Sequence, residues 1–421
     1  MEPDGEAFAA YRLGDLHLVR GEGVRVWDRD STEYLDCVSG TFNLILGHNH
    51  PEVIATIKKE SDGLIFASSM FQTTATNRLM EALVKISPTN LTRVNLRSSG
   101  GSTANEGAIK IAQLHTGRQG VIVPFRSHLG QTLAMAEYSG FSHHRRSFPA
   151  LAAKALNVPD PYCKRCFYRQ NPETCAFLCI DRIDDFLEYA GAGTAACIIL
   201  EPISGVGGNI VPPAGYLSRL KSFCQERGIV LIFDENQTSL GRTGHMFAAD
   251  AFDVQPNIMT VSKCLTGSGL PLAAILMEED LAILERPLHG FTFGGGNLAA
   301  AVAVTTLAVI QRPDFLENVR KVGAHLLGRL EGLERGIPGI FDVRGMGLML
   351  GLELADAEGK RSPHLARAAQ RSLLQNGIIT RVSEHGQGNV IELRPPLILT
   401  HEEADLIADR FEVSLRAVAA T

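Results

Sequence analysis

A lysine and an acid stand at the ends of two apolar runs in the middle of the chain. One run, Asn257–Lys263, ends in a lysine, and the other, Val230–Asp234, ends in an aspartate. Both runs have the length and residue types of buried strands, so we expect both side chains at a sheet edge. An amine there can form a Schiff base, and a carboxylate can keep a pyridine nitrogen protonated. This pair predicts a site for pyridoxal 5′-phosphate (PLP), with Lys263 and Asp234 as catalytic residues.

The elements around these residues alternate between apolar runs and helical patterns. Such alternation predicts an α/β fold in which helices cover both faces of a mainly parallel sheet. The expected strands are 92–97, 121–125, 196–201, 230–234, 257–263 and 272–277, and the expected helices are 103–115 and 214–227. In open α/β sheets, ligands bind beyond the carboxyl ends of strands. The residues expected at such ends are Ser99, Phe125, Glu201, Asp234 and Lys263.

The C-terminal part has a different pattern. Amphipathic helices are expected at 313–334 and 363–376, and strands at 347–353 and 390–394. These elements predict a smaller α+β domain. We expect an N-terminal segment (1–55) that contributes to the small domain, a large PLP-binding domain (56–310) and a C-terminal small domain (311–421).

A phosphate group needs hydrogen-bond donors, and two glycine-rich segments are candidates to supply them. Ser98–Thr103 joins an expected strand to an expected helix, where free backbone N–H groups and the helix dipole attract an anion. Thr292–Asn297 contains three successive glycines, which permit close approach of the backbone to a ligand.

Composition excludes several classes of protein. The chain has 421 residues, of which 45% are hydrophobic and 20% charged, as in globular proteins. A net charge of -6 argues against a nucleic-acid-binding protein. The acidic beginning lacks the apolar core of a signal peptide, and no apolar run is long enough to span a membrane. We therefore expect a cytoplasmic enzyme that contacts neither nucleic acid nor membrane.

Four of the eight cysteines are close together in the sequence, at positions 163, 166, 175 and 179. A Cys-x2-Cys pair followed by two more cysteines could hold zinc or an iron–sulfur cluster. The Cys-x3-Cys spacing of the second pair is less suited to zinc, and reduced thiols or a local disulfide are the alternative. No metal is assigned. The other four cysteines lie in apolar segments and are expected to be reduced core residues.

The ordered motifs resemble those of the class III (ω-amino) aminotransferases, which have PLP fold type I. The resemblance extends over about residues 20–415. The segments that carry it are Gly23–Asp28, Tyr34–Asp36, Gly47–Pro51, Gly101–Glu106, Glu201–Ile203, Asp234–Thr238, Gly241–Gly244, Thr292–Gly295 and Arg394–Leu397, together with the segment around Lys263. A weaker resemblance to antibiotic-pathway enzymes, including aminoglycoside 6′-aminotransferases, rests on Ser127–Gln131 and the cysteine-rich segment.

The resemblance implies a role for each matching residue. Lys263 would form the Schiff base, Asp234 would pair with the ring nitrogen, and Gln237 would lie near the phenolic oxygen. Gly101 and Ser102 would bind the phosphate, joined by Thr292 of a second subunit, so a homodimer with composite sites is implied. Glu201 resembles an acid that, in some members, changes partner as two substrates alternate.

The chain departs from the family pattern at several site positions. His128 stands where an aromatic residue stacks on the ring, and Asn236 replaces an apolar residue on the opposite ring face. Thr103 replaces a common glutamate. Glu392 occupies a position that often carries arginine or lysine next to the substrate carboxylate. Arg394 is retained as a possible carboxylate anchor. Glu392 would favour a cationic substrate or, equally, form a structural salt bridge.

These features predict a PLP-dependent aminotransferase with a ping-pong mechanism. We expect an amine donor and a carbonyl acceptor, the acceptor being a secondary metabolite such as an amino sugar. An ordinary ω-amino acid aminotransferase, and an epimerase or decarboxylase on the same scaffold, are the alternatives. The sequence does not separate these reactions, because the bond that breaks depends on its angle to the ring.

Overall fold

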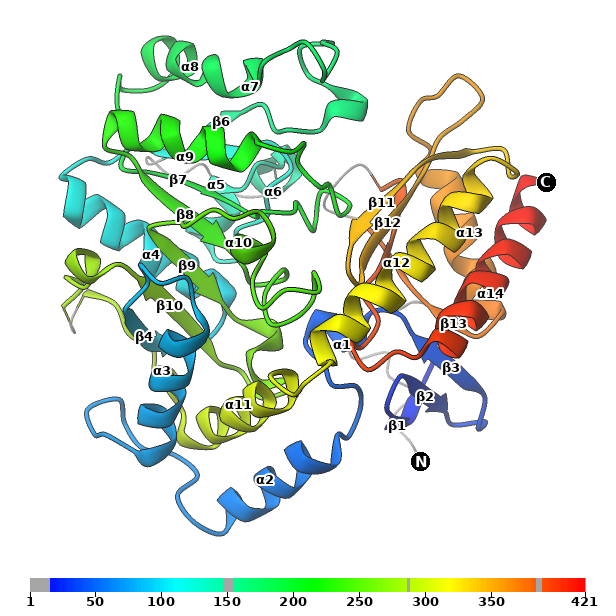
Figure 1. Ribbon diagram of the computed structural model, residues 1–421, viewed down its shortest axis with the longest axis horizontal. Coiled ribbons are helices and arrows are strands. Elements are labelled where there is room, and N and C mark those ends of the chain that lie inside the picture. The colour runs from blue at the N-terminus through cyan, green and yellow to red at the C-terminus, as the bar shows by residue number, and fades with distance from the viewer. Residues whose placement is uncertain (1–15, 147–153, 286–287, 384–387, 421) are drawn as a thin grey trace.

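One large sheet and two small ones organise the computed structural model, which describes residues 16–146, 154–285, 288–383 and 388–420 (Figure 1). The α/β fold with a mainly parallel large sheet, as predicted, is confirmed. The strands of this seven-stranded sheet lie in the order β4 (Arg93–Ser98), β10 (Ala273–Met277), β9 (Ile258–Val261), β8 (Val230–Asp234), β7 (Cys197–Leu200), β5 (Val121–Pro124) and β6 (Leu156–Val158).

Strand direction decides which edge of this sheet carries the site. Strands β5 to β9 pair in parallel, whereas β10 runs antiparallel to both β9 and β4. Two reversals restore the direction, so β4 points the same way as β9. The carboxyl ends of β4, β5, β7, β8 and β9 therefore share one edge, as a ligand site in such a sheet requires.

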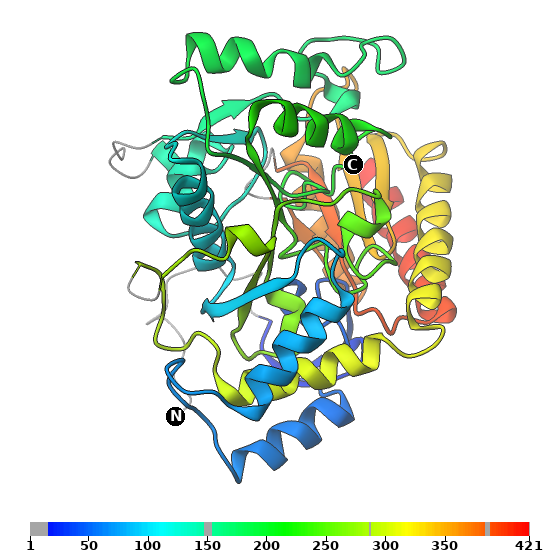
Figure 2. The same cartoon turned by 60° about the vertical axis from the view of Figure 1, so that its left-hand side comes forward.

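Both faces of the large sheet are buried, which explains its unbroken apolar runs. Successive side chains of a strand point to opposite faces. In β8, Ile232 packs in the cluster that contains α4 (Gly101–Thr116), and its neighbours Leu231 and Phe233 pack in the cluster that contains α9 (Tyr216–Arg227). Figure 2 shows helices on both sides of the strands.

Three longer helices pack together beside β4, and short helices fill the connections. The long ones are α2 (Pro51–Ser61), α3 (Thr74–Ile86) and α11 (Asn297–Ile310). The short ones are α1 (Ser39–Phe42), α5 (Leu133–Tyr138), α6 (Ser142–Arg146), α7 (Leu178–Asp181), α8 (Ile183–Tyr189) and α10 (Ala248–Ala251), with 3-10 turns η1 (Cys163–Arg165), η2 (Lys263–Thr266) and η3 (Glu279–Leu281).

Two four-stranded sheets complete the fold. The first consists of β1 (Leu18–Glu22), β2 (Arg25–Asp28), β3 (Glu33–Asp36) and β13 (Ile378–Ile379). The second consists of β11 (Ile340–Met346), β12 (Met349–Leu354), β15 (Val390–Leu393) and β14 (Arg381–Val382). Helices α12 (Phe315–Glu334) and α13 (Pro363–Gln375) pack against these strands, and α14 (His401–Ala419) packs against α12 and α13.

The pairing of β3 with β13 is parallel and joins the N-terminal part of the chain to its C-terminal part. The domain boundaries expected after residues 55 and 310 stay a prediction. Across the described ranges, no single helix is long and apolar enough to cross a membrane. Only α11 and α12 taken together, as a pair bent by 71°, satisfy that criterion by length and composition.

Candidate active site

The shared edge of the large sheet collects most of the residues that the sequence singled out. Asp234 is the last residue of β8, and Glu201 follows the end of β7 directly. The strand expected to reach Lys263 ends at Val261, and Lys263 instead begins the turn η2 with φ of +20°, outside the ordinary regions for a non-glycine residue. The segment from Ser99 to Ser102 follows β4 and opens α4.

Asp234 is buried and is held by two hydrogen bonds. Its Oδ1 accepts from the backbone N–H of Asn236 at 3.0 Å, and its Oδ2 accepts from Asn105 Nδ2 at 2.7 Å. Asn105 is oriented in turn by Thr260, whose hydroxyl donates to Asn105 Oδ1 at 2.7 Å. Burial raises the pKa of Asp234, and the charge of Lys263 opposes that shift. A cation such as a protonated pyridine nitrogen would likewise favour the ionised carboxylate.

Lys263 has the electrostatics of an amine that can react. Burial lowers its pKa, although the carboxylates of Asp234 and Glu201 oppose this effect. A lysine with a lowered pKa is a better nucleophile and a better base near neutral pH than an exposed lysine. The position at the turn after β9 therefore fits the Schiff-base role.

Glu201 is a second buried acid of this edge. Its Oε1 accepts from the backbone N–H of His128 at 3.1 Å, and its Oε2 accepts from that of Gly205 at 3.0 Å. Burial, followed by the charge of Asp234, raises its pKa to about 8. Two carboxyl groups and one amine thus share the space at the ends of β7, β8 and β9.

The beginning of α4 forms the phosphate side of the candidate site. This helix has 16 residues, and the first N–H groups of a helix have no partner within the helix. Ser102 Oγ accepts from the backbone N–H of Gln131 at 3.1 Å. A Cβ on Gly130, which has φ of +144°, would lie 2.2 Å from that oxygen, so the two loops approach each other closely only because of this glycine.

A buried polar atom of Asn236 is also suited to bond a ligand. Asn236 is 3% exposed, and within the described residues its Oδ1 has no hydrogen-bond partner. Its side chain lies 3.0 Å from where a Cβ on Gly101 would stand, beside the start of α4. A buried amide oxygen without a partner is costly unless a ligand or water completes it. With Lys263, Asp234 and the start of α4, this atom makes the residues present a good fit for PLP.

Gln237 connects this site to a buried arginine. Arg394, which follows β15, donates from Nη1 to Gln237 Oε1. It also donates from Nη2 to the carbonyl of Gly205 at 2.8 Å, and from Nε to Asn209 Oδ1 at 3.0 Å. Glu392 is 2% exposed, and its carboxylate lies 3.5 Å from Arg394 Nη2.

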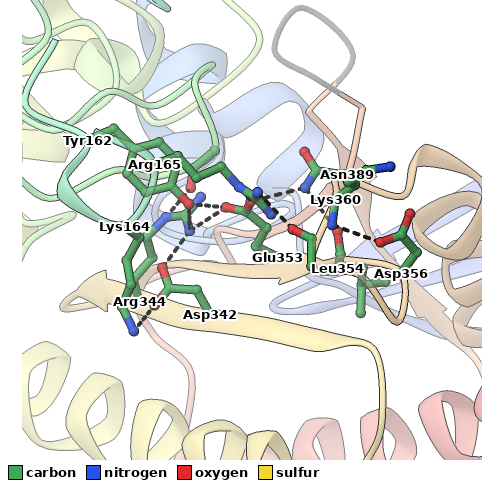
Figure 3. Close-up of polar contacts among 12 residues, drawn as sticks. Tyr162, Lys164, Arg165, Asp342, Arg344, Glu353, Leu354, Asp356, Lys360 and Asn389 are labelled. Atoms are coloured by element: carbon green, nitrogen blue, oxygen red, sulfur yellow. Dashed lines mark hydrogen bonds and ion pairs between the residues drawn. The ribbon is translucent and has the colours of Figure 1, made fainter. Parts of the chain in front are cut away.

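The loop 204–210, which contacts both Glu201 and Arg394, also accepts a hydrogen bond from Arg344. Arg344 belongs to a cluster of ion pairs with Asp342 and Glu353 (Figure 3). Arg344 Nε donates to the carbonyl of Gly208 at 2.9 Å, and its Nη1 donates to Glu353 at 2.8 Å. Glu353 is 1% exposed and also accepts from Arg165 Nε at 2.6 Å and from the hydroxyl of Tyr162. The cysteine-rich segment therefore docks onto β11 and β12 through this cluster.

A sequence profile of the family described as aminotransferase class-III matches residues 10–415. The chain belongs to this family. It is accordingly a PLP-dependent transaminase, and the resemblance found in the sequence is confirmed at the level of the family and the cofactor.

Relatives extend over nearly the full chain. An acetylornithine aminotransferase of Methanothermobacter thermautotrophicus is 35% identical over 400 residues, 95% of this chain and 93% of that protein. A leucine/methionine racemase of Thermococcus litoralis is 34% identical over 95% of this chain and 90% of that protein. The structure of a PLP-bound amine transaminase from an uncultivated Pseudomonas species is 30% identical, with a TM-score of 0.90, over 99% of this chain and 98% of that chain.

For this class-III aminotransferase, the structure brings together most of the expected site residues. They are Gly101, Ser102, Glu201, Asp234, Asn236, Gln237 and Lys263, with His128 joined through its backbone N–H. Thr292 is exposed, on a loop whose Phe291 N–H donates to the carbonyl of Arg97 in β4 at 3.1 Å. Among the residues that the structure describes, no hydrogen bond links Thr292 to the other site residues, and its role stays a prediction.

Two residues that complete the site were not predicted. Asn105 lies in Gly101–Glu106, one of the segments that resemble the aminotransferase family, but nothing in the sequence indicated that it contacts Asp234. Asn209 follows two glycines, and that small-residue run was the only available signal of a tight loop. Both contacts join residues distant in the sequence.

The four clustered cysteines line one small pocket together with Tyr162 and Phe167. All four are free thiols, and burial raises the pKa of Cys179 to about 12. In the part of the chain that the structure describes, no three His, Cys, Asp or Glu side chains are arranged to hold a metal ion. We assign no metal to these thiols.

We expect Lys263→Ala to abolish turnover and to remove the covalent attachment of PLP, because no other amine is placed at this edge by the contacts described above. Borohydride reduction of the wild-type holoenzyme, followed by peptide mapping, should find the cofactor on Lys263. Attachment at a different lysine would overturn the assignment of the whole site.

Replacing Asp234 with asparagine should slow the chemical step by several orders of magnitude. A neutral amide cannot stabilise the charge of a protonated ring nitrogen as negative charge develops on the substrate. Single-turnover kinetics with saturating PLP separates this effect from weaker cofactor binding. A rate within about tenfold of wild type would show that Asp234 is not the partner of the ring nitrogen.

Proposed function

We propose that the protein transfers an amino group by a ping-pong cycle, with Lys263, Asp234 and Glu201 as the groups around the reacting centre. The observation that carries this proposal is the burial of an amine with a lowered pKa beside two carboxyl groups at one sheet edge. When bound, PLP supplies the electron sink for this chemistry. The protein supplies position, charge and a proton-transfer group.

Each of these residues has a distinct task. Lys263, once displaced by the incoming amine, is the base that takes the proton from the amine-bearing carbon of the substrate. Asp234 holds a fixed negative charge opposite the ring nitrogen, and Asn105 fixes its orientation. His128, Asn236 and Gln237 would contact the ring, and Gly101 and Ser102 would hold the phosphate. We assign Glu392 and Arg394 to substrate recognition.

We make two proposals about the substrates, one based on a relative of this chain and one based on the polar residues of the site. The relatedness to an acetylornithine aminotransferase favours an amine donor that also carries a carboxylate. A cationic or amino-sugar acceptor, and with it a role in antibiotic biosynthesis, rests on the polar residues Asn236, His128 and Glu392. Because Glu392 lies 3.5 Å from Arg394, part of its charge is already compensated, which weakens that second proposal. None of the relatives reported above is named for such a pathway.

Racemisation is a second candidate reaction, favoured by the 34% identity to a leucine/methionine racemase. Racemisation and transamination both begin by removing the same proton, and they differ in where the proton returns. The residues at the sheet edge are compatible with both.

Amine and keto-acid screening in D2O should distinguish the two reactions. In transamination, each effective amine converts the cofactor to its amino form and releases a carbonyl product, and an added keto acid reverses that change. In racemisation, an optically pure amino acid loses its optical activity and gains deuterium, with no keto acid released. Solvent deuterium in a racemised product without stoichiometric carbonyl release would reject transamination as the main reaction.

We further propose that the active form is a homodimer with composite sites in the cytoplasm. An apolar surface supports the dimer, formed by Leu64, Ile65, Phe66, Met70, Phe71, Phe291 and Phe293. These large side chains are all more than a third exposed, and Phe66 and Phe293 contact each other with ring centroids 6.3 Å apart. Exposed apolar patches of this kind are typical of subunit interfaces. Thr292 lies between two of these residues.

A subunit-mixing experiment tests this arrangement. Lys263→Ala and Thr292→Asp should each be nearly inactive, the first for lack of the amine and the second because an acid repels the phosphate. If Thr292 serves the other subunit, a mixed dimer regains one intact site. Unfolding and refolding the two variants together should then restore about a quarter of wild-type activity. No recovery, with mixed dimers demonstrated by differently sized tags, would place Thr292 outside the partner's site.

A further inference from the structure

The chain turns sharply between β5 and His128, and this turn contains an arginine in a strained conformation. The backbone N–H of Ser127 donates to the carbonyl of Pro124 at 3.3 Å, which closes a β-turn. Arg126 is the third residue of the turn and has φ of +62°. A positive φ at that position normally selects glycine or asparagine, because the Cβ of other residues is crowded there. The turn therefore depends on other contacts of Arg126.

The side chain of Arg126 is held by a buried ion pair with Asp160. Its Nε donates to Asp160 Oδ2 at 2.6 Å, and its Nη2 donates to Asp160 Oδ1, so the pair is bidentate. The two side chains are only 15% and 3% exposed, and the ring of Tyr162 lies 5.2 Å from Arg126 Cζ. Burial raises the pKa of Asp160, and the charge of Arg126 opposes that shift. A bidentate pair fixes the orientation of both partners as well as their charge.

The backbone of Arg126 is fixed by the loop 204–210. The hydroxyl of Ser204 donates to the carbonyl of Arg126 at 3.1 Å. A Cβ on Gly207 would lie 3.1 Å from the Cβ of Arg126, so the loop and the turn approach each other closely. The same loop bonds to Glu201 through its backbone. The turn is therefore held by the loop and by the ion pair together.

His128 follows the turn directly and leads into the candidate site. Its backbone N–H donates to Glu201 Oε1 at 3.1 Å, and the carbonyl of Ser127 accepts from the backbone N–H of Gly140 at 2.8 Å. Each residue has two soft backbone dihedrals, so a change of φ at Arg126 would redirect the residues that follow. The conformation of Arg126 thus determines where the imidazole of His128 lies.

We infer that Arg126 and Asp160 are positioning residues for His128. Their ion pair holds the turn in its left-handed conformation, and the turn places the imidazole against the cofactor ring. Strained backbone of this kind persists only where the surrounding contacts over-determine it. The inference rests on the proposed function, in which His128 contacts the ring. It also gives the cysteine-rich segment a second task, because Asp160 leads into that segment.

Arg126→Ala should release the turn, because alanine cannot form the ion pair and is strained at positive φ. Two properties of the purified, PLP-loaded enzyme report on His128: the circular dichroism of the bound cofactor, and the rate of PLP release on dilution. We expect Arg126→Ala to reproduce the circular dichroism of His128→Ala and to speed PLP release about tenfold. Because Arg126 acts through His128, combining the two substitutions should change neither property further.

Arg227→Ala is the matched control. Arg227 also forms a bidentate pair, in which its Nε donates to Asp184 Oδ1 at 2.7 Å and its Nη2 to Asp184 Oδ2, but this pair joins α9 to α8. The control should keep the circular dichroism of the cofactor and the rate of PLP release of the wild type.

Substitution of the acid provides a rescue experiment. Asp160→Asn leaves Arg126 buried without a charged partner, which is costly, and we expect the same changes as for Arg126→Ala. Adding Arg126→Gly to Asp160→Asn removes both charges and supplies a residue that adopts positive φ freely. The double variant should release PLP at a rate within about threefold of wild type and recover the circular dichroism of the cofactor. If Asp160 only stabilised its own segment, Arg126→Gly would not rescue it.

The inference is overturned if Arg126→Ala behaves as the control, if its effect adds to that of His128→Ala, or if the double variant shows no recovery. Should Arg126→Ala fail to fold, the double variant decides alone: recovery supports the inference, and its absence overturns it. If the cofactor signal follows Arg126 through His128 but wild type converts no amine, the inference stands and the proposed function fails. If wild type transaminates but the cofactor signal is indifferent to Arg126, the proposed function stands and the inference fails.

Discussion

The structure depends on burying several charged groups together and satisfying each of them. Lys263, Asp234, Glu201 and Arg394 all lie around the carboxyl edge of the large sheet, where burial opposes the charged form of every one. Such groups remain ionised only when opposite charges and hydrogen bonds compensate for lost hydration. The polar residues around them are therefore not incidental to an apolar core. They set which protonation states the site can adopt.

This requirement extends far beyond the residues at the reacting centre. Asp234 needs Asn105, and Asn105 needs Thr260 in the neighbouring strand. Arg394 needs Asn209, on the loop that Arg344 fixes. Arg344 in turn contacts Glu353, which also binds Arg165 of the cysteine-rich segment. A chain of largely buried hydrogen bonds thus connects the cysteine-rich segment to Arg394. The cysteine-rich segment therefore helps to position the loop 204–210, independently of its thiols.

The residues that lie at the ends of strands could be predicted from the sequence as members of the site. Asp234 and Glu201 could be assigned because buried apolar runs reveal strands, and parallel strands deliver their ends to one edge. The strand leading to Lys263 was predicted two residues too long, because the turn η2 and its positive φ leave no mark in an apolar pattern. The strands β1 to β3 were not predicted at all, although their motifs were recognised.

Contacts between loops could not be predicted from the sequence, and these contacts determine which residues surround Arg394. Asn209 and Arg394 are separated by 185 positions, and their meeting depends on how β15 is placed against the loop 204–210. Arg394 was expected as a possible carboxylate anchor, a role that stays a prediction, and its complete burial and its bonds to Asn209, Gln237 and Gly205 were not foreseen. Periodicity and propensity report which residues are buried, not which distant partner each one meets.

The proposed roles also separate the residues of the reaction from those of substrate choice. The residues proposed to act on the reacting atoms lie at or just beyond the ends of β7, β8 and β9, whereas Glu392 and Arg394 come from β15 and its continuation. The loop 204–210 lies between these two sets and contacts both, through Glu201 on one side and Arg394 on the other. A substitution in this loop can therefore change the surroundings of Arg394 while the strands that lead to Asp234 and Lys263 remain unaltered. Relatives named for transamination and for racemisation, each about a third identical to this chain, are consistent with such a division. In the proposed mechanism, residues at the sheet edge remove a proton, and the loops beside that edge select the molecule that presents it.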